Sequence, residues 1–126
     1  MRVPERVRLI HAVATPAALD SASWPPDAIV LRIAPDAALV FNTAPPVLSD
    51  PHAIVQHDDG YAAVWLSADE AADWLARYCA WELPPQRPAF AQGAVAGLPV
   101  KLWLDATRVL VLVPAPYATD LEERLR

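Results

Sequence analysis

The chain has 126 residues, a formal net charge of −5 and 55 % hydrophobic residues. This length suits one compact domain. An acidic chain without a basic cluster is not expected to bind nucleic acid or an anionic membrane surface. The single cysteine, Cys79, excludes an intramolecular disulfide and favours a reducing, cytoplasmic compartment, and no export signal is expected.

Residues 1–27 show the weakest pattern in the chain. Arg6 to Ala14 alternates like a strand, but Pro16, Pro25 and Pro26 follow and interrupt any regular element. We therefore expect residues 1–27 to form an irregular N-terminal arm and residues 28–126 to form a single α+β domain.

The first part of this domain is predicted to hold a hairpin followed by a loop. Residues 28–34 and 38–42 have strand character, and Pro35-Asp36 between them is typical of a turn. Residues 43–51 contain three prolines, which predicts a loop.

The next stretch predicts a second hairpin and a capped helix. Residues 53–57 and 61–66 have strand character, and Asp58-Asp59-Gly60 between them is typical of a turn. Ser67-Ala68-Asp69-Glu70 has the form of a capping box, in which the serine and the glutamate satisfy each other's backbone amides. A helix is therefore expected from about Ala68 to Ala80.

The remaining chain predicts three strands and a final helix. The strands cover 90–96, 100–104 and 109–113, and the last of them is apolar on both faces, which indicates a central, buried strand. Pro116 is well placed in the first turn of the final helix. The predicted fold class is α+β, with two helices packed on one face of an antiparallel sheet.

The sequence predicts no catalytic, cofactor-binding or metal-binding residue. His52 and His57 lie an odd number of residues apart on a predicted strand and so on opposite faces, which is unfavourable for a metal site. Cys79 falls near the C-terminal end of the predicted helix, where no helix N-terminus lowers a thiol pKa, so a structural role is expected.

Five tryptophans are many for a chain of this length. A domain this small cannot bury all of its apolar surface, and tryptophan is enriched at protein interfaces. We therefore predict a partner interface that includes some of four indoles: Trp65, Trp74, Trp81 and Trp103. The alternative is a core, private to this chain, that encloses all of them.

Residues 60–83 and 90–125 resemble the gamma subunit of heterotetrameric sarcosine oxidase, and residues 31–41 are similar to a strand–Pro-Asp–strand segment of that family. More distantly, the chain is similar to the small domain of folate-binding aminomethyltransferases. It is shorter than typical gamma subunits, and Ala68 stands where the family usually has glycine. These departures leave open which amine or amino-acid oxidase assembly the chain joins.

The resemblance implies a non-catalytic accessory subunit that stabilises an oxidoreductase complex of one-carbon metabolism. The flavin and NAD of such complexes are expected on larger flavoprotein partner subunits, and no cofactor is expected in this chain. Two alternatives stay open. One is a free-standing homo-oligomeric binding module, and the other is a small folate-handling or one-carbon-transfer domain, for which Asp36 or Asp105 would supply the carboxylate.

Overall fold

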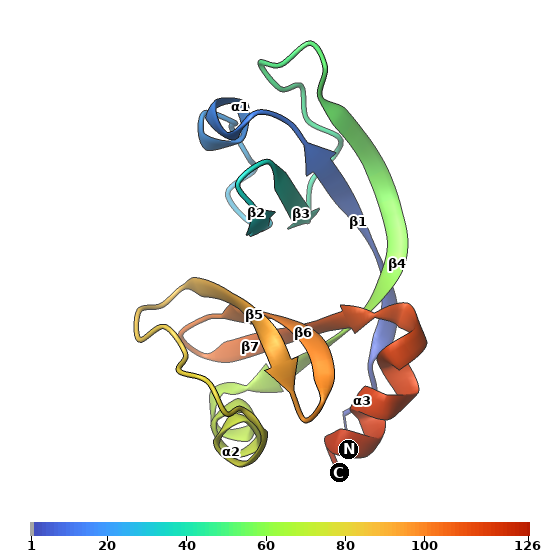
Figure 1. Cartoon of the computed structure of the whole chain (residues 1–126), viewed down its shortest axis with the longest axis vertical. Coiled ribbons are helices and arrows are strands. Elements are labelled where there is room, and N and C mark those ends of the chain that lie inside the picture. Colours follow the sequence, from blue (N-terminus) through green and yellow to red (C-terminus); the bar gives the residue numbers. More distant parts are fainter. Residues whose placement is uncertain (1) are drawn as a thin grey trace. The chain divides into compact units, whose positions relative to one another are not determined.

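The computed structural model describes residues 2–126, which divide into two compact units (Figure 1). Unit 1 joins the described part of Met1–Val7 to Gly60–Arg126, and unit 2 is Arg8–Asp59. Two strands, β1 (Glu5–Val13) and β4 (Ile54–Ser67), contribute residues to both units.

The sheet of unit 1 is antiparallel, in the order β1-β4-β7-β6-β5. Its later strands are β5 (Ala89–Val95), β6 (Leu98–Leu104) and β7 (Arg108–Pro114). β7 lies between β4 and β6, and five consecutive residues within it, 109–113, are buried. The predicted central strand is therefore confirmed.

One face of this sheet is covered by helices. Helix α2 (Ala68–Tyr78) and helix α3 (Ala118–Arg124), which follows the short 3-10 turn η1 (Ala115–Tyr117), lie on the same side of the strands (Figure 1). Leu75 of α2 and Leu121 of α3 belong to one apolar cluster with side chains from β4 to β7. The predicted α+β class, with two helices on one face of an antiparallel sheet, is confirmed.

The start of α2 is fixed by the predicted capping box. The Ser67 hydroxyl accepts a hydrogen bond from the backbone N–H of Glu70 at 3.1 Å, and the Glu70 carboxylate accepts one from the backbone N–H of Ser67 at 3.0 Å. These bonds satisfy two amides that the first helical turn leaves without intrahelical partners.

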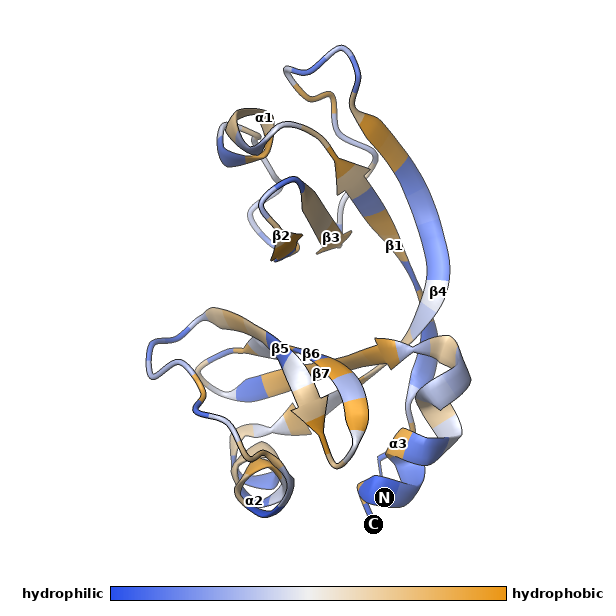
Figure 2. Ribbon diagram, viewed as in Figure 1, coloured by the Kyte–Doolittle hydropathy of each residue, from blue (hydrophilic) through white to orange (hydrophobic). Residues whose placement is uncertain are grey.

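The turn expected at Asp58-Asp59-Gly60 is wrong, because β4 runs through these residues as one strand of 14 residues. Figure 2 shows this part of β4 as a hydrophilic stretch. Two side chains of β1 pair with it: His11 Nδ1 lies 3.6 Å from an Asp58 carboxylate oxygen, and Arg8 Nε lies 3.6 Å from one of Asp59. These cross-strand pairs favour the extended backbone over a turn.

Unit 2 is a smaller antiparallel sheet in the order β2-β3-β1-β4. Its hairpin of β2 (Ile29–Ala34) and β3 (Ala37–Phe41) matches the predicted one. Its buried side chains include Leu9, Leu31 and Leu39. Two further small clusters are buried, one rich in alanine around Leu19 and one around Ile10 and Val40.

Residues 1–27 differ from the irregular arm that we expected. They contain β1 and the short helix α1 (Pro16–Asp20), and the Thr15 hydroxyl caps α1 by accepting from the Ala18 N–H at 3.2 Å. Proline is favoured at the first position of a helix, so Pro16 starts an element here and does not interrupt one.

None of the helices within residues 2–126 is long and apolar enough to cross a membrane.

Candidate functional site

The sheet face of unit 1 opposite the helices carries a row of large side chains. Directly paired residues of an antiparallel sheet project to the same face. The pairings Phe90↔Trp103, Trp103↔Leu110 and Leu110↔Trp65 therefore place four side chains side by side across β5, β6, β7 and β4. We call Phe90, Trp103, Leu110 and Trp65 the aromatic row.

Two cations lie beside aromatic rings on this face. The Arg108 guanidinium carbon is 3.8 Å from the centre of the Trp65 ring, and Lys101 Nζ is 5.8 Å from the centre of the Tyr61 ring. Both distances lie within the range of a cation–π interaction. Burial lowers the pKa of Lys101, because removal from water disfavours its charged form.

The predicted indoles fall into three different environments. Trp65 and Trp103 stand in the aromatic row, and both are half-buried. Trp74 is only 3 % exposed, and its Nε1 donates to the carbonyl oxygen of Arg124 at 3.0 Å. Its predicted place in a partner interface is therefore corrected: Trp74 belongs to the core of unit 1.

Trp81 is fixed against the edge of the sheet. Its Nε1 donates to the carbonyl oxygen of Ala94 at 2.8 Å, and its ring packs so closely on Gly93 that a Cβ there would lie 2.8 Å from a ring carbon. The sheet register is continuous through Gly93, so this glycine provides space for the indole and is not the site of a bulge.

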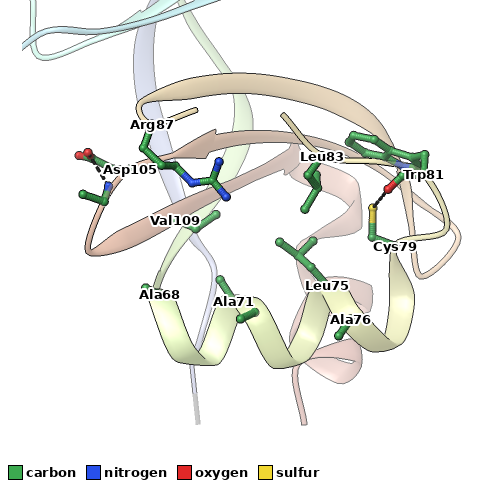
Figure 3. A pocket seen from close by; sticks show the side chains of 12 residues that line it. Ala68, Ala71, Leu75, Ala76, Cys79, Trp81, Leu83, Arg87, Asp105 and Val109 are labelled. Carbon is green, nitrogen blue, oxygen red and sulfur yellow. Dashed lines mark hydrogen bonds between the residues drawn. The ribbon is translucent and has the colours of Figure 1, made fainter. Parts of the chain in front are cut away.

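A groove of about 520 Å³ lies beside α2 on the helix side of unit 1 (Figure 3). Its apolar walls come from the helix (Ala71, Leu75), from the loop that follows it (Trp81, Leu83) and from β7 (Val109). The groove also contains two charged residues, Arg87 and Asp105, and the thiol of Cys79.

The acidic, histidine and cysteine side chains of the described residues form no cluster suited to a metal ion. No group of three or more His, Cys, Asp or Glu side chains able to hold a metal ion is found in residues 2–126. His52 and His57 are exposed in unit 2. The Cys79 thiol donates to the carbonyl oxygen of Trp81 at 3.3 Å, which is a structural contact.

Two carboxylates have lowered pKa values for structural reasons. The hydrogen bond from Arg2 and that from the backbone N–H of Ser67 lower the pKa of Glu70 to about 2. The backbone N–H groups of His52 and Thr15 donate to Asp50 and lower its pKa. Both carboxylates hold backbone in place, so neither shift indicates an acid–base catalyst.

The two carboxylates considered for a folate-handling domain both lie in turns. Asp36 is exposed in the β2–β3 turn of unit 2. Asp105 lies in the β6–β7 turn of unit 1, where its carboxylate accepts the Ala106 N–H at 2.8 Å. Each carboxylate therefore sits where turn chemistry alone explains it.

Comparison with protein-family models, with curated proteins and with solved structures gave no match. The resemblance to the sarcosine oxidase gamma subunit stays a prediction. Among the residues of the site region that were not singled out by the sequence are two arginines, Arg108 and Arg87. Arg108 could have been found, because it alternates with Leu110 on one face of β7.

Proposed function

We propose that this chain is a non-catalytic accessory subunit of a multi-subunit, flavin-dependent sarcosine oxidase or related N-methyl amino-acid dehydrogenase, and that it stabilises the assembly. In this proposal the flavin and NAD are held by larger partner subunits in the cytoplasm. The resemblance of residues 60–83 and 90–125 supports the family, and the aromatic row supports the accessory role.

The aromatic row is the observation that carries the proposal. Tryptophan and arginine dominate the energetic centres of protein interfaces, and here Trp65, Trp103 and Arg108 share one sheet face. β7 holds the row in the middle of the sheet, so little side-chain or backbone entropy remains to be lost when a partner binds. Leu110 in the row is only 2 % exposed, whereas Trp65 and Trp103 on either side of it are part-exposed, so these two indoles are the surface that the row offers to another folded protein.

Co-purification tests this role. The tagged chain is co-expressed with the large subunits of a heterotetrameric sarcosine oxidase, and flavin absorbance retained with the tag is measured. We expect stoichiometric flavin with the wild type. The variants Trp65→Ala and Trp103→Ala are expected to lose roughly 30-fold or more in affinity, as typical hot-spot residues do.

A matched control uses Tyr78→Ala, which removes a 38 % exposed aromatic ring of α2 outside the aromatic row. This variant should bind as the wild type does, and circular dichroism should show all three variants folded. A wild-type chain that retains no flavoprotein, or that forms a dimer unchanged by the large subunits in light scattering, would contradict the proposal.

A further inference from the structure

The groove beside α2 has the dimensions and lining of a small-molecule site. Its volume of about 520 Å³ falls within the range of roughly 300–1,000 Å³ that is typical of ligand pockets. Such pockets combine mostly apolar walls with a few fixed polar groups. Here Leu75, Leu83 and Val109 supply apolar walls, and Arg87 supplies a polar group.

Arg87 is held over the groove by its own loop. Its Nη1 donates to the carbonyl oxygens of Pro84 at 2.7 Å and Gln86 at 2.9 Å, which fixes the guanidinium without neutralising it. Figure 3 shows the guanidinium extending over the groove between Val109 and Leu83. In the described part of the chain, no carboxylate forms an ion pair with Arg87, and its Nε and Nη2 have no acceptor.

Asp105, the only anionic residue among the described residues that line the groove, does not oppose this charge. Asp105 uses its carboxylate to accept the Ala106 N–H, and the carboxylate points away from Arg87 in Figure 3. The groove therefore presents one oriented cation above an apolar floor. The Nε–Nη2 edge of a guanidinium matches the two oxygens of a carboxylate.

We propose that this groove binds a small carboxylic acid with an apolar chain. The carboxylate accepts hydrogen bonds from Nε and Nη2 of Arg87, and the chain packs against Leu75, Leu83 and Val109. This site lies on the helix side of the sheet and the aromatic row on the opposite face, so the inference does not depend on the proposed accessory role.

Calorimetry with a matched pair of probes tests the inference on the full chain. Octanoate and 1-octanol have the same apolar chain and differ in the charged group. We expect saturable binding of octanoate, about tenfold tighter than that of octanol, because hydrogen bonds to charged groups are worth about one decade in affinity or more. In Arg87→Gln this preference for octanoate should disappear.

Arg87→Gln also removes the hydrogen bonds from Arg87 to its own loop, so a second variant is placed outside that loop, on α2. Ala72 is an exposed residue of α2 that lines the groove, so Ala72→Trp fills the apolar floor while Arg87 stays in place. Binding of both octanoate and octanol should be lost. Cys79 lines the same groove, so its alkylation rate reports whether octanoate binds there. Octanoate should slow alkylation of Cys79 in the wild type but not in Ala72→Trp.

Three outcomes would overturn the inference: no saturable binding of octanoate to a folded wild-type chain, equal affinity of octanoate for wild type and Arg87→Gln, or unchanged binding to Ala72→Trp. Protection of Cys79 by the large flavoprotein subunits, without binding of octanoate, would instead assign the groove to a protein segment. Because the aromatic-row variants are tested separately, failure here leaves the accessory role standing.

Discussion

The two faces of the unit 1 sheet use neighbouring residues of the same strands for different purposes. Leu102 is fully buried under the helices, whereas the next residue, Trp103, stands in the aromatic row and keeps part of its surface exposed. In β4, likewise, Val64 packs in the cluster on the helix side, whereas the next residue, Trp65, stands in the aromatic row. A strand period of two therefore lets one short segment carry both the core and a candidate recognition surface.

The largest expected effect comes from truncation on the helix side. Leu102→Ala removes a side chain with 0 % exposure and should lower the free energy of unfolding by about 2–5 kcal/mol, since it leaves a cavity in a packed core. Urea denaturation followed by circular dichroism measures this. Trp103→Ala, one residue along, should cost less; a loss equal to that of Leu102→Ala would contradict the division between a core face and a part-exposed face.

A smaller effect is expected where the indole of Trp81 lies on the sheet edge. Gly93→Ala places a Cβ 2.8 Å from a ring carbon, so the ring must move and strain the hydrogen bond to Ala94. We expect a loss of about 1–3 kcal/mol. The double-mutant cycle with Trp81→Ala sharpens the test, because Gly93→Ala should cost almost nothing once the indole is absent.

The smallest effect concerns the charge at the start of α2. The pKa of Glu70 is lowered from 4.5 to about 2, so its ionised form stabilises the folded state fully above pH 4.5, and this contribution is lost as the pH falls towards 2. The melting temperature of Glu70→Gln should fall less steeply than that of the wild type across this range. Arg2→Gln should behave similarly, because Arg2 is the first cause of the shift; identical slopes in all three proteins would contradict this.

Most elements of unit 1 could be predicted from local patterns. The capping box, the apolar run of β7 and the proline-rich segment after α2 each depend on residues close in sequence. The long strand β4 could not be predicted, because Asp58 and Asp59 are turn residues by local preference. Their extended conformation is favoured by side-chain contacts with His11 and Arg8, which lie more than forty residues earlier.

The candidate site, too, depends on contacts between residues that are distant in the sequence, which local patterns do not reveal. Trp74 could not be assigned to the core from its helix position alone, since its indole is satisfied by the carbonyl of Arg124, 50 residues away. Trp65 and Trp103 could be singled out by type, but only the strand pairing brings them into one row. Arg87 lies in a proline-rich loop without periodicity, so no sequence pattern indicates that it extends over the groove.

Lys101, the only lysine of the chain, is on the same sheet face as the aromatic row. Amine-directed chemistry on this protein therefore has one side-chain target, and that target adjoins the surface proposed for recognition. Immobilising the chain through this lysine on a sensor surface would obstruct this surface and give falsely weak affinities. An amine-reactive crosslinker, in contrast, would report selectively on whatever docks there.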